Sequence, residues 1–200
     1  AYDFYPRISV GSLRPLGWFN HLNEFGLYPI VVTRQFDGAY EYDSEEFISG
    51  VCVHIKHNHY GSVYRVASNS KGKQLWKADS RNRNLCRKTS TALNMLYNYL
   101  NYPKGDIACM NLISNEILSR HNVSVIIATG EPFLLFKHAK LLSIDSGIPY
   151  VIDYRDSWTS NEARPINIIM KSLLRIVEKN WANKACFITT AAMLYKKNLQ

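Results

Sequence analysis

Hydrophobic residues along this chain gather in short runs that alternate with longer stretches of helical spacing. The clearest runs, rich in β-branched residues, cover 28–33, 123–128, 148–153 and 186–190, and each predicts a buried strand. Weaker patterns predict strands at 51–55 and 63–67, with Gly61 and Ser62 marking a hairpin or a loop between them. Residues 35–50 are polar, aromatic and acidic, and we assign no strand or helix there.

Helices are predicted between these strands. Leu13, Leu16, Phe19, Leu22 and Phe25 share one face of a helix that Ser12 would cap and Gly26 would end, with Pro15 in its first turn. Further helices are expected at 85–100, 107–120, 133–145, 166–184 and from residue 191. Strands that alternate with helices of this length indicate βαβ units. The predicted fold class is therefore α/β, a Rossmann-like and mostly parallel sheet flanked by helices.

The two ends of the sequence carry incomplete patterns. Residues 1–6 read as the tail of a strand that enters a loop, so we expect the body of that strand upstream of Ala1. The last residues read as the beginning of a helix, which suggests a further domain after residue 200. We interpret residues 1–200 as one domain of a two-domain protein.

Composition narrows the class of protein. With 46% apolar residues the chain can bury a core, and it has neither a run of about twenty apolar residues nor a segment resembling a signal peptide. Four scattered cysteines without a CxxC pair suggest reduced thiols in a cytoplasmic protein. The net charge of +8 favours anionic partners such as phosphates, acidic membrane surfaces or nucleic acid, although a merely solvated basic surface explains it equally well.

Charged and aromatic residues directly follow the strand predicted at 148–153. Burying charged groups just past a buried strand costs free energy unless they are paired or line a site. The residues at this position are Asp153, Arg155, Asp156 and Trp158. In open α/β sheets the carboxyl ends of the strands are where ligands bind. This segment therefore predicts a cleft.

Three segments, taken together, resemble the amino-terminal half of GT-B glycosyltransferases of family four. Residues 5–17 (Tyr-Pro-Arg-Ile-Ser-Val-Gly-Ser-Leu-Arg-Pro-Leu-Gly), followed by 22–26 (Leu-Asn-Glu-Phe-Gly), resemble that family's opening loop and helix. Residues 128–132 (Ala-Thr-Gly-Glu-Pro) resemble its turn after a strand, and 151–158 (Val-Ile-Asp-Tyr-Arg-Asp-Ser-Trp) resemble its Asp-Phe-Arg-Asp-Pro-Trp segment. Family members often carry two or three glycines in the first loop, where this chain has Gly11 alone.

The resemblance implies an acceptor-side Rossmann-like domain, with most of the nucleotide-sugar bound by a second, carboxy-terminal domain. The full protein would transfer a sugar, with retention of configuration, from a nucleotide-diphosphate donor to a glycan or lipid-linked glycan. It would need no cofactor and no metal, and the isolated domain would be nearly inactive.

On this interpretation the first loop and helix bind substrate through Gly11, Ser12 and Arg14, at a helix N-terminus suited to anions. The alternative is a plain turn before a capped helix. Asp156 and Arg155 are the candidate catalytic residues: the carboxylate would orient or deprotonate an acceptor hydroxyl, and the cation would stabilise departing phosphate. Alternatively, Arg155 only bridges carboxylates and fixes the loop, with Trp158 packed over it.

Further candidate substrate-binding residues are Asp153, Trp158, Thr129, Gly130 and Glu131. Glu131 is also a candidate cap for the following helix. His54, His57 and His59 invite a metal site, but no neighbouring cysteine or carboxylate in their segment completes one, and we expect none. His21 and His138 are expected to be surface or packing residues on helices.

The helix at 166–184 offers a further surface. Ile169, Leu173, Ile176 and Trp181 share one face, and Lys171, Arg175 and Lys179 recur on another. This pattern fits a core-packed helix with a solvated basic face, or one that docks on anionic lipid at the inner face of a membrane. Alternative functions are a sugar-nucleotide epimerase of the same fold and a non-catalytic basic module for membrane or nucleic acid. Nucleic acid is the less expected partner, because the aromatic residues form no stacking platform.

Overall fold

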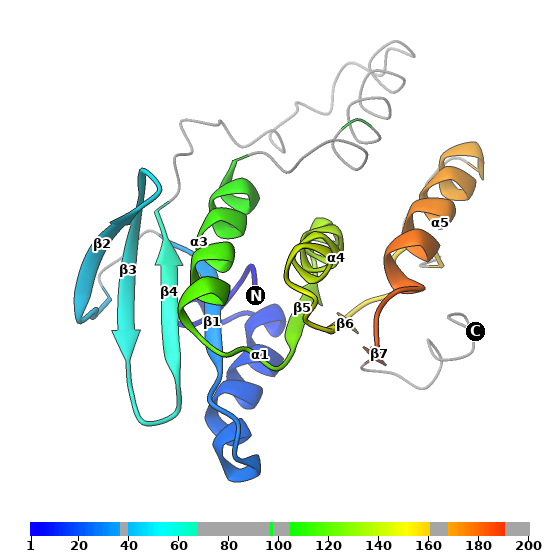
Figure 1. Ribbon diagram of the computed structural model, residues 1–200. Helices are drawn as coiled ribbons and strands as arrows, with labels where there is room; N and C mark the ends of the chain where they lie inside the picture. The colour runs from blue at the N-terminus through cyan, green and yellow to red at the C-terminus, as the bar shows by residue number, and fades with distance from the viewer. Residues whose placement is uncertain (37–39, 68–96, 98–104, 161–167, 191–200) are drawn as a thin grey trace, which may run out of the picture.

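The computed structural model describes residues 1–36, 40–67, 97, 105–160 and 168–190. In chain order the elements are α1 (Val10–His21), the 3-10 helix η1 (Leu22–Phe25), β1 (Ile30–Arg34), β2 (Ser44–Ile48), β3 (Val51–His57), β4 (Ser62–Val66), α3 (Asp106–Arg120), β5 (Ile126–Gly130), α4 (Leu134–Ser146), β6 (Tyr150–Tyr154), α5 (Ile168–Ala182) and β7 (Phe187–Thr190). They form a mixed α/β fold (Figure 1). The helices predicted at 85–100 and from 191 lie outside the described residues, apart from Tyr97, which is helical.

The strands form two sheets. Sheet A has the order β1-β4-β3-β2, in which β1 and β4 are parallel and the other two pairs antiparallel. Sheet B has the order β5-β6-β7 and is parallel throughout. The predicted α/β class is thus confirmed. The expectation of a mostly parallel sheet holds for sheet B and is wrong for sheet A, because β2, β3 and β4 follow one another as antiparallel neighbours.

Strand β2 was not predicted. Its sequence, Ser-Glu-Glu-Phe-Ile, carries two adjacent acids and lies in the stretch to which no element was assigned. It is an edge strand, and charged residues are ordinary there because the outer face and edge meet solvent. Backbone pairing with the more apolar β3 stabilises it, with Phe47 opposite Cys52 and Ile48 opposite Val51.

Alternating side chains place helices on both faces of sheet A. Val31 and Val63 pack with Phe19 of α1 on one face, whereas Val32 and Val66 belong to the main core with α3 on the other face. This follows from the period of two in a β-strand. Helix α4 packs on β5 and β6 of sheet B and against α3, so one helical layer covers both sheets (Figure 1).

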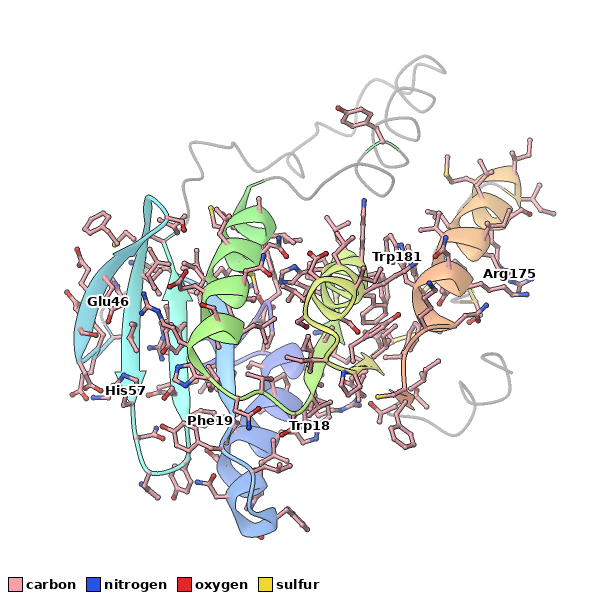
Figure 2. All side chains as sticks on the ribbon, in the orientation of Figure 1. Trp18, Phe19, Glu46, His57, Arg175 and Trp181 are labelled. Atoms are coloured by element: carbon pink, nitrogen blue, oxygen red, sulfur yellow. The ribbon has the colours of Figure 1, made fainter. Side chains whose placement is uncertain are left out.

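Helix α5 is rotated relative to the expected amphipathic face. Leu174 and Trp181 are buried, whereas Ile176 is 65% exposed and Leu173 is also exposed. Figure 2 shows Trp181 on the side of α5 that faces α4 and Arg175 on the opposite side. The apolar stripe of Ile169, Leu173 and Ile176 is therefore an outer face, and assigning it with Trp181 to one packed face was wrong.

Two composition-based predictions can be compared with the described residues. Cys52, Cys109 and Cys186 are free thiols, as expected, although Cys186 is exposed, and Cys86 lies outside the described part. No helix in the described segments has the length and apolar character needed to cross a membrane.

Candidate functional site

The first turn of α1 meets the loop after β6. A Cβ on Gly11 would lie 1.9 Å from Nη1 of Arg155, so the guanidinium occupies the space that any other residue at position 11 would fill. One turn further along α1, Arg14 forms an ion pair with Asp153 at the end of β6. The structure therefore brings together residues from two of the predicted segments at the carboxyl end of a parallel strand, although Arg14 and Asp153 are 139 positions apart in the sequence. This is the position at which open α/β sheets bind ligands.

The beginning of α1 differs from the prediction. The helix begins at Val10 with Ser9 as N-cap, so Ser12 is the third residue inside it. The Ser12 hydroxyl accepts a hydrogen bond from the Ser9 amide and donates one to the Ser9 carbonyl, both at 2.9 Å. Ser12 is 2% exposed. Its side chain thus holds the start of the helix and does not face a cleft, and its assignment as N-cap was wrong.

Because the helix begins earlier than predicted, Pro15 lies in the second turn and not in the first. Proline has no amide hydrogen, so it cannot donate the helical hydrogen bond to the carbonyl four residues before it. That carbonyl belongs to Gly11. The Gly11 carbonyl, in the turn beside Arg155, therefore receives no helical hydrogen bond from residue 15.

Asp153 anchors α1 to sheet B. It is 1% exposed, and its Oδ1 accepts hydrogen bonds from Arg14 and, at 2.8 Å, from the Thr189 hydroxyl of β7. A buried carboxylate needs such partners, since an unpaired one is strongly unfavourable. Asp153 therefore joins α1, β6 and β7 through side-chain contacts within the protein. The residues that a ligand can reach are the next ones in the loop.

Arg155 lies between two accessible carboxylates. Its Nη2 is 3.6 Å from Oε2 of Glu131, and its Nε donates to Oδ2 of Asp156 at 3.3 Å. Side-chain exposures of 23% for Arg155, 35% for Glu131 and 45% for Asp156 leave all three within reach of a ligand. These long, partly solvated contacts can be exchanged for contacts to a phosphate or a hydroxyl at modest cost.

Glu131 does not cap the helix that follows it. Helix α4 has Phe133 as its N-cap residue and no side-chain cap hydrogen bond. Its carboxylate faces Arg155 instead, and its role in substrate binding stays a prediction.

The remaining predicted site residues from β5 and the loop are buried. Thr129 is 8% exposed. A Cβ on Gly130 would lie 2.9 Å from ring atoms of Phe133 and of Phe136, so packing demands glycine there. Trp158 is 2% exposed and stacks between Phe133, at 4.9 Å, and Trp181, at 5.3 Å. These three residues therefore belong to the packed interior, and the packing of Trp158 over Arg155 stays a prediction.

A buried glutamate that was not predicted as a site residue also fixes this loop. Glu178 of α5 accepts hydrogen bonds from the hydroxyl of Thr159 and, at 3.3 Å, from its amide. Burial, reinforced by the neighbouring Glu178, raises the pKa of the Tyr154 hydroxyl well above its usual range. One sequence feature could have revealed Glu178: it is an acid among the apolar positions Leu174 and Trp181 of an amphipathic helix.

The three histidines of the β3 segment do not converge. His57 contacts the Ser62 hydroxyl at 2.8 Å, and His59 packs on the ring of Tyr60. His54 lies 2.9 Å from Glu45, and Tyr40 binds its other ring nitrogen at 2.8 Å. The three histidines therefore form no cluster with one another.

The premise that these histidines have no neighbouring cysteine or carboxylate was wrong for His54. Among the described residues, Glu45, Cys52 and His54 place their ligand atoms within 4.8 Å of one another. Burial and the nearby Glu45 raise the pKa of the Cys52 thiol, which favours the protonated form that does not bind metal. The absence of a metal requirement stays a prediction.

His21 and His138 occupy the two kinds of position expected of them. His21 is exposed and contacts Glu24 at 2.6 Å. His138 is 6% exposed in α4, and burial lowers its pKa to about 4.

Comparison with known proteins adds no information on this site. No protein-family model matches the chain, and no curated protein or solved structure matches it. Any role for Arg155 and its neighbours therefore rests on their own geometry and on the motifs of the sequence.

Proposed function

We propose that this chain is the acceptor-side domain of a glycosyltransferase with a GT-B fold. The observation that carries the proposal is the position of Arg155, seated in the space left by Gly11 at the first turn of α1 and flanked by Glu131 and Asp156. The three segments that resemble family-four enzymes contribute these four residues. A cation beside a helix N-terminus, at the carboxyl end of a parallel strand, suits a diphosphate.

The reaction assigns distinct tasks to these groups. The bond between the sugar's anomeric carbon and the diphosphate oxygen breaks, and a bond to an acceptor hydroxyl oxygen forms with retention of configuration. Arg155 and the amides of the first turn of α1 stabilise the charge that develops on the departing diphosphate. Asp156 orients the acceptor hydroxyl, whose proton passes to the carboxylate or to the departing phosphate. A second domain supplies most contacts to the nucleotide and closes the cleft.

An acceptor with an apolar part fits the surface beside this site. Ile8, Val10 and Leu13, in the loop and first turns of α1, are 77%, 81% and 55% exposed. A lipid-linked glycan would cover such side chains while presenting its hydroxyl groups to Asp156. The outer face of α5, with exposed Leu173 and Ile176 beside Arg175 and Lys179, supports peripheral contact with an anionic membrane.

The test is a donor and acceptor screen with the longest form of the protein that its gene encodes. We expect release of a nucleoside diphosphate from at least one nucleotide sugar, dependent on a glycan or lipid-linked acceptor. A new nucleotide sugar formed without acceptor would indicate the epimerase. No response to any nucleotide sugar, together with salt-sensitive binding to RNA or anionic vesicles, would indicate a binding module.

A further inference from the structure

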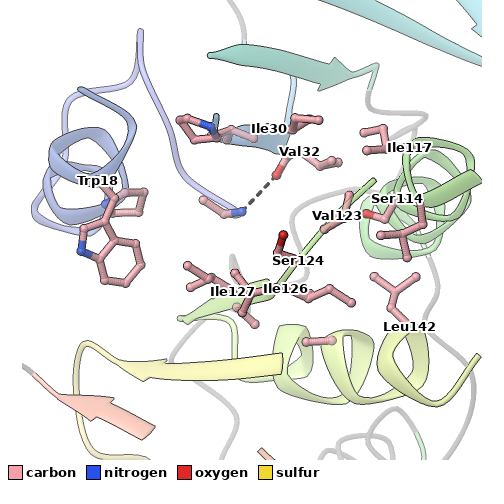
Figure 3. Close-up of a pocket in the computed structure, with 18 of the residues that line it drawn as sticks. Trp18, Ile30, Val32, Ser114, Ile117, Val123, Ser124, Ile126, Ile127 and Leu142 are labelled. Atoms are coloured by element: carbon pink, nitrogen blue, oxygen red, sulfur yellow. Dashed lines mark hydrogen bonds between the residues drawn. The ribbon is translucent and has the colours of Figure 1, made fainter. Parts of the chain in front are cut away.

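A cavity of about 540 Å³ lies between the free edges of the two sheets. Its walls are mainly apolar: Ile30 and Val32 come from β1, Ile126 and Ile127 from β5, Trp18 from α1 and Ile117 from α3. Figure 3 shows these side chains around the hollow, with α1 on one side and α3 on the other. Ile127 is 37% exposed although its strand is covered by helices, because its side chain borders this space.

Both walls are strand edges that pair with no other described strand. Strand β1 pairs with β4, and β5 pairs with β6. Helices α3 and α4 pack against each other, with α3 on β1 and α4 on β5. The helical layer is therefore continuous while the hydrogen-bonded sheet beneath it is interrupted. Backbone amides and carbonyls along such covered edges need partners.

Residues 1–3 already run along one of these edges. The Ala1 nitrogen donates to the Val32 carbonyl at 3.0 Å, and the Thr33 hydroxyl donates to the Tyr2 carbonyl at 3.1 Å. Asp3 pairs with Arg34 at 3.1 Å. The partners on β1 advance with residue number, so this segment is parallel to β1. Traced backward from Ala1, the same direction leads along Val31 and Ile30 into the cavity.

The surroundings of the Ala1 nitrogen suit a peptide amide better than an ammonium group. The nitrogen lies at the wall of the apolar cavity and has one carbonyl partner, the stoichiometry of an amide in a β-ladder. Burial lowers the pKa of this amine from 8.0 to about 5. A neutral amide N–H at the same place would carry no such desolvation cost.

We infer that the cavity is the seat of one more parallel strand, formed by residues directly preceding Ala1, which joins sheets A and B into one continuous sheet. A strand between two parallel neighbours and under helices on both faces is buried throughout, so its sequence would be about four to six uncharged residues rich in Val, Ile and Leu. Such a strand satisfies both backbone edges, which an apolar small molecule cannot do.

The test compares two extended chains of equal length. One carries Ile-Val-Val-Ile-Val directly before Ala1, and the matched control carries Ile-Pro-Val-Pro-Val, whose prolines cannot donate ladder hydrogen bonds. We expect the first to melt about 10 °C higher than the control, since about 1 kcal/mol corresponds to 2–4 °C in a chain of this size. Amide exchange should slow at least about tenfold in β1 and β5 of the first chain alone.

A second pair of variants keeps the test decisive if either extension alters solubility. Ile126→Asp places a carboxylate in the cavity wall and should abolish the difference between the two extensions, whereas Ile144→Asp, on the exposed face of α4, should preserve it. Equal melting and equal exchange of the two extended chains would overturn the inference. Undiminished uptake of an apolar dye by the chain with the apolar extension would overturn it too, and would identify a ligand pocket.

Discussion

The guanidinium of Arg155 fills the place of the side chain that Gly11 lacks, with Nη1 1.9 Å from the position of a Cβ on that glycine. The contact couples the first turn of α1 to the loop after β6. It also explains why glycine is required at a helical position where it is normally unfavourable. Any side chain at position 11 must displace the group that we propose to bind the leaving diphosphate.

Gly11→Ala should therefore separate stability from activity. The obstructing atom is the end of a flexible side chain, so we expect less than about 1 kcal/mol of destabilisation, because the intrinsic helix preference for alanine offsets part of the strain. Glycosyl transfer should fall at least about tenfold. The matched control is Gly17→Ala in the same helix, where a Cβ meets nothing within 4 Å. That variant should be stabilised by about 0.5–1 kcal/mol with unchanged activity. Equal activity of the two variants would contradict the proposal that the space beside Gly11 must be kept free for the Arg155 guanidinium.

Arg14→Ala should destabilise the chain much more. It leaves the carboxylate of Asp153, buried beneath α1, without its cation, and breaking a buried pair in this way costs about 3 kcal/mol. Urea unfolding followed by far-UV circular dichroism measures the loss. The control is Arg120→Ala, which removes exposed ion pairs with Glu116 and Glu46 and should change the free energy of unfolding far less. Similar losses for both would show that Asp153 does not depend on Arg14.

Stability should rise with pH between about 4 and 8. Burial lowers the pKa of the Ala1 amine from 8.0 to about 5 and that of His138 from 6.5 to about 4. Between each pair of values the unfolded chain binds a proton that the folded chain does not, so folding is favoured as pH increases and stability is lost as pH falls. Each contribution is constant above the upper value of its pair.

Two variants separate these contributions. Acetylation of the Ala1 amine should remove the contribution of that amine between pH 5 and 8, leave the contribution of His138 below about pH 6.5, and add on the order of 2 kcal/mol at pH 5, after allowance for partial exposure. His138→Gln should remove the part between pH 4 and 6.5. Denaturant midpoints across this range provide the measurement. An unaltered pH profile after acetylation would refute burial of the amine.

Helix α5 should bind anionic vesicles through its outer face. Ile176→Asp and Arg175→Glu each introduce negative charge on that exposed face, and should weaken sedimentation with vesicles of acidic lipid at least about fivefold. Neither should alter unfolding, because both side chains are exposed. Ile144→Asp, on the exposed end of α4, is the matched control and should bind like the unaltered chain. Binding that is insensitive to both α5 variants would exclude this face.

Strands with a strong hydrophobic pattern were predicted well from the sequence. Edge strands and the first residues of helices were predicted less well. Each of the four apolar runs became a strand with small shifts, β1 and β5 to β7. Burial explains the apolar composition of β6, whereas β7, which was predicted to be buried, is largely exposed in the described structure. Strand β2 escaped prediction because an edge strand needs only one apolar side, and cross-strand pairing rather than its own sequence stabilises it. The start of α1 was misplaced because Ser9 and Ser12 are both competent caps, and only packing distinguishes them.

The candidate site was predicted as a set of segments but not residue by residue. Gly11 and Arg155 are far apart in the sequence, and the family resemblance assigned their segments to one cleft without predicting that the two residues meet. Tertiary packing decides which of these residues stay accessible to a ligand. Asp153 is buried and bonded to Arg14 and Thr189, whereas Asp156 remains half-exposed. Such differences between neighbouring carboxylates carry no sequence signature.

The most direct test of the proposed site is the effect of Arg155 on sugar transfer by the longest form of the protein that its gene encodes. Release of nucleoside diphosphate in the presence of acceptor should fall about a hundredfold or more in Arg155→Ala, with partial recovery in Arg155→Lys, as expected for a group that stabilises charge in the transition state. Arg175→Ala, on the outer face of α5, should retain full turnover of a soluble acceptor. Equal turnover by Arg155→Ala and the unaltered protein, or no nucleotide release from any sugar donor across a broad acceptor panel, would contradict the account.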